Sequence, residues 1–198
     1  MRITGGQAKG RVLASPKGLK IRPTTDQVRE AIFNIIGQDL SGLKVLDLFA
    51  GTGSLGLESL SRGALSALFI DSSQQSVNLI KKNLATCGHQ GSGAAIKRDL
   101  RRGITLNHPL IKESVDLVFV DPPYRNNIIS FLLEELSTKE VVSSGSLVVA
   151  ESSKSESPPV SLKPFQMVDT RLYGITRISI YEYEAKNEWK NSYLSRIF

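Results

Sequence analysis

The sequence predicts an α/β fold in which a mostly parallel sheet is covered by helices on both faces. Strand-like and helix-like patterns alternate from Lys44 to Ala150, as is typical of a parallel sheet. A glycine-rich loop, Gly51 to Gly56, directly follows the first apolar strand. Two late strand-like runs, broken at Tyr173-Gly174, predict a terminal antiparallel hairpin. With 198 residues, the chain is long enough for one domain with a sizeable core.

The first 36 residues contain two different patterns. Residues 1–22 hold glycine, lysine and arginine with short apolar pairs, and they predict a small β-hairpin or an extended arm. A helix is expected next, with Thr24 and Gln27 placed as a capping box and Gly37 as a suitable stop. Its apolar residues recur at helical spacing, namely Val28, Ala31, Ile32, Ile35 and Ile36.

From Lys44 onward, short apolar runs predict strands, and apolar residues three or four positions apart predict helices. The strands are expected at 45–50, 67–71, 94–96, 115–121 and 146–150, and the helices at 54–62, around 77–84 and around 128–136. Ser72 or Ser73 is expected to cap the second of these helices. The hairpin is expected at 165–172 and 175–183, after a polar loop at 152–159. We therefore divide the chain into a basic arm (1–22), a main domain (23–184) and a tail without a clear pattern (185–198).

Positive charge is concentrated near the N-terminus. The net charge is +6, and residues 1–44 hold eight Lys/Arg against three Asp/Glu, which leaves 17 against 16 in the other 154 residues. Such a segment indicates a polyanionic partner, although a solvated basic face explains the charge equally well.

Several classes of protein do not fit the composition. No apolar run approaches the roughly 20 residues needed to span a bilayer, and no signal-peptide h-region follows Met1, so we expect a cytoplasmic protein without a membrane partner. The single cysteine, Cys87, excludes an internal disulfide and a cysteine-rich metal site. Both histidines, His89 and His108, are expected in solvated loops, and we expect no metal cofactor.

The glycine loop fits two kinds of ligand. Residues 51–56, Gly-Thr-Gly-Ser-Leu-Gly, match the dinucleotide fingerprint, and Asp71 lies where a ribose-binding acid belongs. An NAD(P) or flavin enzyme is therefore one interpretation, and a plain packing turn is another. Asp47, four residues before Gly51, favours S-adenosylmethionine. A carboxylate facing the crevice repels a pyrophosphate, whereas it attracts a sulfonium and an amino group.

Asp99 follows the weak third strand and has two interpretations. A carboxylate at this place in the topology can accept a hydrogen bond from the N6 amino group of adenine. It can equally cap a helix that begins at Leu100. The pattern alone leaves both open.

The tetrad Asp121-Pro122-Pro123-Tyr124 carries the most chemical information. It ends a strong apolar strand, and two prolines force the chain out of the sheet at the ligand-binding edge. An exocyclic amine on a base is a poor nucleophile, because its lone pair is delocalised into the ring. The Asp121 carboxylate and the Pro122 carbonyl can accept hydrogen bonds from its two N–H groups. Tyr124 can stack on the base once the base has left the RNA stack. The alternative is a simple Pro-Pro turn with a surface tyrosine.

The combination of motifs resembles bacterial methyltransferases that act on guanine N2 of 16S ribosomal RNA (guanine 966 type). The resemblance runs from the N-terminus to about residue 183. The segment from Arg22 to Glu30, Arg-Pro-Thr-Thr-Asp-Gln-Val-Arg-Glu, is the most family-specific stretch. The other matching segments are 2–6 (Arg-Ile-Thr-Gly-Gly), 9–11 (Lys-Gly-Arg), 47–56 (Asp-Leu-Phe-Ala-Gly-Thr-Gly-Ser-Leu-Gly) and 121–124 (Asp-Pro-Pro-Tyr).

This resemblance implies a Rossmann-like class I methyltransferase fold with a seven-stranded sheet and S-adenosylmethionine as methyl donor. It implies 16S rRNA in a small-subunit particle as acceptor, and we expect a monomer. The expected cofactor-binding residues are Thr24, Asp26, Arg29, Asp47, Phe49, Ala50, Gly51, Gly53, Asp71, Ser72, Asp99 and Leu100. The expected RNA contacts are Arg2, Lys9, Arg11 and Arg22, with Lys17 and Lys20 between them.

Three other functions remain as alternatives. The same tetrad chemistry serves adenine N6 or cytosine N4 in DNA, or a protein amide, although a DNA-sequence reader normally needs a larger recognition region. An NAD(P)-dependent oxidoreductase is disfavoured by Asp47 and the tetrad. An RNA-binding module without catalysis is disfavoured by the intact acids Asp47, Asp71 and Asp121.

Overall fold

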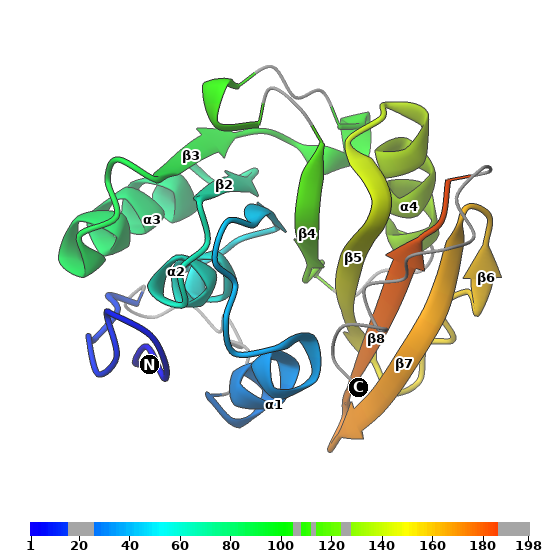
Figure 1. Cartoon of the computed structure of the whole chain (residues 1–198), viewed down its shortest axis with the longest axis horizontal. Coiled ribbons are helices and arrows are strands. Elements are labelled where there is room, and N and C mark those ends of the chain that lie inside the picture. The colour runs from blue at the N-terminus through cyan, green and yellow to red at the C-terminus, as the bar shows by residue number, and fades with distance from the viewer. Residues whose placement is uncertain (16–25, 105–107, 112–113, 124–127, 186–198) are drawn as a thin grey trace.

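A computed structural model describes residues 1–15, 26–104, 108–111, 114–123 and 128–185. Its sheet holds eight strands within these residues, in the order β3-β2-β1-β4-β5-β8-β7-β6 (Figure 1). The five strands from β3 to β5 in this order are parallel. Strand β8 pairs antiparallel with β5, and β7 and β6 continue the sheet with antiparallel pairing. The strands are β1 (Lys44–Leu48), β2 (Ser66–Asp71), β3 (Gly93–Lys97), β4 (Val115–Val120), β5 (Val142–Ser153), β6 (Ser161–Leu162), β7 (Phe165–Tyr173) and β8 (Thr176–Tyr183).

The helices cover both faces of the sheet, as expected (Figure 1). They are α1 (Asp26–Ile36), α2 (Ser54–Ser61), α3 (Gln74–Cys87) and α4 (Ile128–Thr138), with short 3-10 turns η1 (Leu100–Arg102) and η2 (Pro109–Ile111). Ser73, not Ser72, caps α3, because its side chain accepts from the Ser76 amide. Gly37 follows α1 with a φ of 106°, which suits a glycine stop. The expected Thr24 cap lies outside the described residues.

Two details of the sheet differ from the prediction. The expected sheet has seven strands, but the two-residue strand β6 pairs with β7 and makes eight. A strand of two residues is too short to show any periodicity in the sequence. Strand β5 is also longer than expected and includes Ser152 and Ser153, because its C-terminal half pairs with β8.

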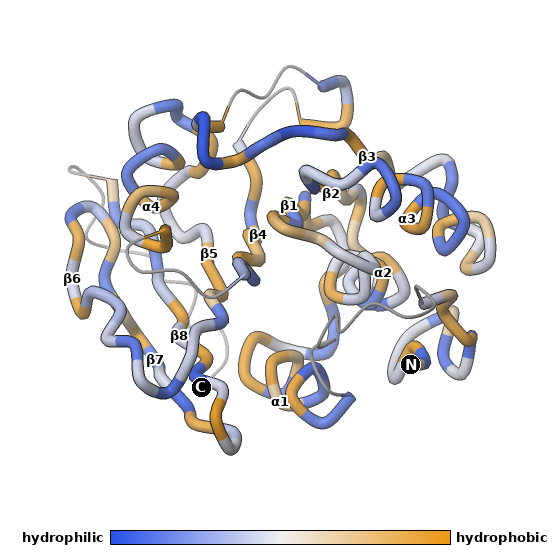
Figure 2. The backbone as a smooth tube through the Cα atoms, turned by 180° about the vertical axis from the view of Figure 1, so that it is seen from behind, coloured by the Kyte–Doolittle hydropathy of each residue, from blue (hydrophilic) through white to orange (hydrophobic). Residues whose placement is uncertain are grey.

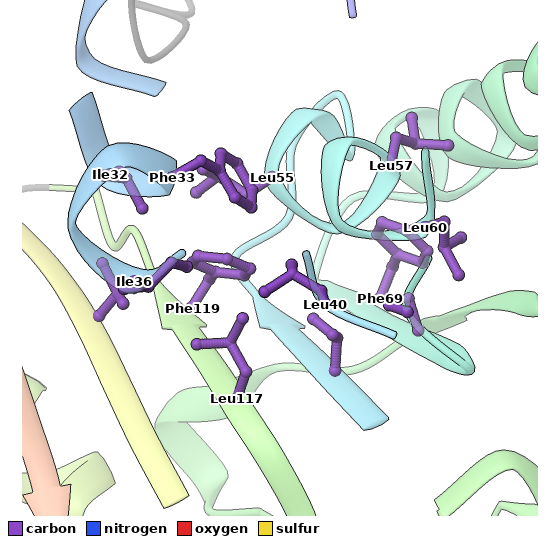
Figure 3. Close-up of a cluster of buried hydrophobic side chains, with 14 of the residues drawn as sticks. Ile32, Phe33, Ile36, Leu40, Leu55, Leu57, Leu60, Phe69, Leu117 and Phe119 are labelled. Carbon is purple, nitrogen blue, oxygen red and sulfur yellow. The ribbon is translucent and has the colours of Figure 1, made fainter. Parts of the chain in front are cut away.

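Alternating side chains of the central strands build two cores. Val45, Leu117 and Phe119 point to the face covered by α1, α2 and α3, while Leu46 and Val118 point to the face covered by α4. On the first face, the ring of Phe33 in α1 lies 6.0 Å from that of Phe119, and Leu40 packs beside them (Figure 3). Hydrophobic residues accordingly gather on the central strands, α1 and α4 (Figure 2). Asp47 lies between Leu46 and Leu48 in β1, and therefore on the first face.

The first 15 residues share this core rather than projecting from it. Antiparallel hydrogen bonds join Ile3 to Arg11 and to Gly10, around an isolated bridge between Arg2 and Val12. The side chains of Ile3, Ala8 and Leu13 are buried in the core cluster on the first face. The N-terminal segment thus lies along α2 and α3 (Figure 1).

Among the described residues, no helix has both the length and the apolar character to cross a bilayer. His89 is half-buried, not solvated as expected, and burial lowers its pKa. It follows α3, where its amide bonds to the Leu84 carbonyl.

Candidate active site

Acidic and glycine residues meet at the edge where the parallel strands end. The glycine loop follows β1, Asp71 ends β2 and Asp121 follows β4. These three strands are neighbours in the sheet, with Leu48 opposite both Ile70 and Val120. The Asp121 amide approaches the Leu48 carbonyl at 3.4 Å. Ligands of open α/β sheets bind at this edge, so the glycine loop, Asp71 and Asp121 come together where a ligand is expected.

The start of the glycine loop, together with the two residues before it, is held by hydrogen bonds on both sides of Gly51. The Gly51 amide donates to Oδ2 of Asp71 at 2.9 Å, and the Ala50 carbonyl accepts from the Gly53 amide at 2.7 Å. The Thr52 carbonyl accepts from Nδ2 of Asn83 at 3.0 Å. Within the described chain, the peptide between Gly51 and Thr52 makes no such bond. This peptide is the part of the loop that a ligand can use.

The glycines of the loop serve different purposes. A Cβ on Gly53 would meet Ile80 at 3.1 Å, and a Cβ on Gly56 would run into the Phe69 ring, so both glycines allow close packing. Gly51 is partly exposed, and a Cβ there would make only an ordinary contact with the Phe49 carbonyl oxygen at 3.9 Å, but its φ of 55° favours glycine. Phe49 also has a positive φ of 58°, which is uncommon outside glycine and typical of functional loops.

Asp47 is placed differently from the expected open carboxylate. Its side chain is only 2% exposed, and Oδ2 accepts from the Gly56 amide in the first turn of α2 at 2.9 Å. Burial raises the pKa of Asp47 well above its usual value, and Asp121 and Asp71 raise it further. Asp47 therefore fixes the start of α2 beneath the loop and does not face open solvent.

Asp71 keeps the position expected of a ribose-binding acid. It is partly exposed at the end of β2, beside the loop. One carboxylate oxygen accepts from Gly51 and the other from the Ser73 amide at 2.8 Å. These bonds orient the carboxylate and leave acceptor lone pairs on both oxygens. The neighbouring Ser72 is exposed at the same strand end.

Asp99 and Leu100 follow the capping interpretation. Asp99 is the N-cap of η1 and accepts from the Arg101 amide at 3.1 Å, while Leu100 is buried in the core. The Arg101 guanidinium also binds the Asp99 carboxylate, at 2.7 Å, and this hydrogen bond lowers the pKa of Asp99 to about 2. A capping role does not prevent the remaining lone pairs from meeting a ligand.

Arg29 lies inside the protein and not against an open cleft. Its side chain is 0% exposed and forms ion pairs with Glu58 at 3.2 Å and with Asp26 at 3.0 Å. It also donates to the main-chain carbonyl of Arg2. Asp26 is 53% exposed on its side chain and remains accessible. The family-specific segment around Arg29 therefore holds the N-terminal segment in place.

Glu58 and Asn83 are buried polar residues that the sequence analysis missed. Glu58 forms ion pairs with Arg29 and Arg62 and accepts a hydrogen bond from the Thr4 amide. Asn83 donates a hydrogen bond to the glycine loop. The sequence holds a weak signal for each. Glu58 is the one charged residue in a helix whose other positions are apolar or small, and Asn83 is three residues after Ile80 on the buried stripe of α3.

The tetrad begins with a half-exposed Asp121, a buried Pro122 and an exposed Pro123. Strand β4 ends at Val120, so the prolines do leave the sheet there. Tyr124 lies outside the described residues, as do Thr24, Arg22, Lys17 and Lys20. Among the remaining basic candidates, Arg2, Lys9 and Arg11 are all exposed. No group of three or more His, Cys, Asp or Glu side chains suited to a metal ion occurs within the described residues.

Comparison with known proteins identifies the family of this chain. A family model described as "Conserved hypothetical protein 95" matches residues 1–182. YlbH of Bacillus subtilis is 34% identical over 92% of this chain and 98% of its own length. "Ribosomal RNA small subunit methyltransferase D" of Escherichia coli is 31% identical over 95% of this chain and 92% of its own length.

The fold of a solved relative agrees with this match. The structure of the Escherichia coli protein yhhF superposes with a TM-score of 0.80 at 31% identity, covering 94% of this chain and 99% of its own. The family model spans most of the chain, and the relatives align over nearly their full lengths. The chain therefore belongs to the "Conserved hypothetical protein 95" family, together with the bacterial small-subunit ribosomal RNA methyltransferases D.

Proposed function

We propose that this protein transfers a methyl group from S-adenosylmethionine to the exocyclic N2 amino group of a guanine in 16S rRNA. The observation that carries the proposal is the meeting of the glycine loop, Asp71 and Asp121 at one edge of the sheet. The relative named as a small-subunit rRNA methyltransferase supports the substrate. We further propose a cytoplasmic monomer that acts on a small-subunit particle.

The loop fits S-adenosylmethionine better than a dinucleotide. A pyrophosphate binds the free amides at a helix N-terminus, but in α2 the Asp47 carboxyl group already holds the Gly56 amide. The Gly51 backbone and the Asp71 carboxylate can still bind S-adenosylmethionine, which is a nucleoside that carries an amino acid. The peptide between Gly51 and Thr52 and the Asp71 carboxylate would contact this donor directly, and Phe49, Ala50 and Gly53 would shape the loop around it. Asp26, Ser72 and Asp99 are proposed as further contacts. When bound, it supplies an electrophilic methyl group on a sulfonium.

The protein contributes orientation and charge at the amine. The Asp121 carboxylate is partly exposed beside the loop, and it can accept one N–H of the target amine. The Pro122 carbonyl can accept a hydrogen bond from the second, because β4 ends at Val120 and Pro122 lies outside its ladder. Two acceptors favour a tetrahedral nitrogen with its lone pair directed at the methyl group. Asp121 then accepts or relays the proton that the methylated amine loses.

The RNA-contacting surface is proposed to include the exposed cations of the N-terminal segment. Arg2, Lys9 and Arg11 lie on a segment whose docked end, Ala14, shares Asn83 with the glycine loop. Phosphate contacts there position the RNA without reading its sequence. Recognition of the base falls to the tetrad.

Asp121→Ala tests the chemical role. The variant is expected to lose at least about 100-fold in kcat, because one of two oriented acceptors is gone, while its affinity for S-adenosylhomocysteine stays within about threefold. Methyl transfer from labelled donor to 16S rRNA gives the rate, and calorimetric titration gives the affinity. Asp169→Ala is the control, because Asp169 lies on β7 and pairs with Arg171 of the same strand, away from the glycine loop. An Asp121→Ala enzyme with normal kcat refutes the role, and a wild-type protein that binds NAD but not S-adenosylhomocysteine refutes the proposed function.

A further inference from the structure

Asn83 is a fully buried amide on α3, and its side chain contacts two separate segments. Its Oδ1 accepts from the Ala14 amide at 2.8 Å, and Nδ2 donates to the Ala14 carbonyl at 3.2 Å and to the Thr52 carbonyl at 3.0 Å. Burying an amide side chain is costly unless its groups are paired, and here both donor and acceptor are used. Hydrophobic packing of α3 would be served equally well by leucine, so the polar contacts are the reason for asparagine.

The contact with Thr52 is one of two hydrogen bonds that fix a single peptide unit of the glycine loop. The Thr52 carbonyl and the Gly53 amide belong to the same peptide unit. The carbonyl is bound by Asn83, and the amide is bound by the Ala50 carbonyl at 2.7 Å. The peptide between Ala50 and Gly51 is fixed in the same way, by Gly53 and Asp71. The peptide between Gly51 and Thr52, which makes no hydrogen bond within the described residues, is therefore held between two fixed neighbours.

The contact with Ala14 fixes the N-terminal segment by its main chain. Asn83 binds both the N–H and the carbonyl of Ala14, as a neighbouring strand would. Ala14 follows Leu13, which is buried in the core, and lies three residues after the exposed Arg11. A single side chain thus joins the segment that presents basic residues to the loop that follows β1.

We infer that Asn83 is a positioning residue that couples occupancy of the glycine loop to the docking of the N-terminal segment. This inference rests on the proposed function, because the loop ligand is taken to be S-adenosylmethionine. A ligand that rigidifies the loop holds the Thr52 carbonyl in a fixed position. The fixed carbonyl orients the Asn83 side chain, which in turn stabilises the hydrogen bonds to Ala14. The coupling is reciprocal, so a displaced segment weakens ligand binding at the loop.

The isosteric variant Asn83→Asp removes both donor contacts and keeps the acceptor for the Ala14 amide. A carboxylate in this place also repels the Thr52 and Ala14 carbonyls. We expect the Kd for S-adenosylhomocysteine and the KM for the methyl donor to rise about tenfold, from the loss of one oriented hydrogen bond to the loop, with kcat changed less than KM. Asn78→Asp, on the exposed face of the same helix, is the matched control and should keep both constants within about twofold of wild type.

Hydrogen exchange of the wild-type protein tests the coupling without any variant. Saturation with S-adenosylhomocysteine should slow exchange of both the Gly53 amide, in the loop, and the Ala14 amide, in the segment. Slower exchange at Gly53 alone would overturn the inference, as would an Asn83→Asp protein with unchanged affinity. If Asn83→Asp does not fold, the exchange result decides. A wild-type protein that fails to bind S-adenosylhomocysteine refutes the proposed function instead.

Discussion

Glu58→Gln should destabilise the protein severely, because Glu58 is the centre of a buried charge network. Its carboxylate is 0% exposed and pairs with Arg29, also 0% exposed, at 3.2 Å and with the 6% exposed Arg62 at 2.8 Å. The same oxygens accept from the Thr4 and Gly5 amides at 2.9 and 2.7 Å. Glutamine replaces one acceptor oxygen with a donor and leaves two nearly buried guanidinium groups without the Glu58 charge.

The magnitude follows from the burial of the partners. Removing one member of a buried ion pair costs about 3–5 kcal/mol, because the remaining charge stays desolvated. For a chain of this size, 1 kcal/mol shifts Tm by about 2–4 °C, so Tm should fall by roughly 6–20 °C. The Phe33 ring, 4.7 Å from the Arg62 guanidinium, recovers only a small part of this loss.

Urea unfolding followed by circular dichroism measures the change in the free energy of unfolding. Limited trypsin digestion is a second assay, since cleavage after Lys9 and Arg11 should accelerate when Thr4 and Gly5 lose their acceptor. Glu30→Gln is the matched control, because Glu30 is exposed on α1 and makes no ion pair within the described residues. A loss of less than about 1 kcal/mol in Glu58→Gln would refute the network, since that value is typical of a solvated surface pair.

Two further predictions concern charge. Replacing Lys9 and Arg11 by Ala should flatten the salt dependence of RNA binding. The slope of log K against log salt concentration should change by about 0.7–0.9 for each phosphate that is no longer bound. Lys139→Ala, after α4, is the control, and an unchanged slope contradicts the proposed role of these cations. Asp47→Asn keeps an acceptor for the Gly56 amide and removes the buried ionisable group. Because the folded pKa of Asp47 is raised, wild-type stability falls as pH rises from about 4 through the folded pKa. The Tm advantage of Asp47→Asn should therefore grow with pH, and parallel Tm profiles would contradict the assignment.

The regular elements of this fold could be predicted because each has a clear local pattern. Strand β4 is a nearly continuous apolar run, and α4 shows a clear apolar stripe, so both appear close to their expected bounds. The terminal hairpin breaks at Tyr173-Gly174 as predicted, because Gly174 adopts a φ of 62° there. Strand β6 could not be predicted, because its two residues pair only once β7 is in place.

The site was only partly predictable, for a different physical reason. The order of strands brings Asp71 and Asp121 to one edge, and topology alone predicts that. The direction of a side chain depends on tertiary contacts that the sequence does not display. Asp47 turns inward to the Gly56 amide, and Arg29 turns inward to Glu58, although both belong to motifs that indicate a ligand. Buried polar residues are therefore the hardest members of this site to assign from sequence.

The docking of the N-terminal segment explains how one stretch can be part of the core and also the proposed surface for RNA. The helices bury the side chains of Ile3, Ala8 and Leu13 and also bond to the main chain of the segment. Glu58 accepts from the Thr4 and Gly5 amides, Ser61 bonds to Gly5 and Ala8 at 2.6 and 2.8 Å, and Asn83 binds Ala14. Because these interactions use backbone groups, the side chains of Lys9 and Arg11 stay exposed on a fixed backbone. A fixed backbone beneath these cations would reduce the entropy cost of binding phosphates, so under the proposed function the buried network serves recognition as well as stability.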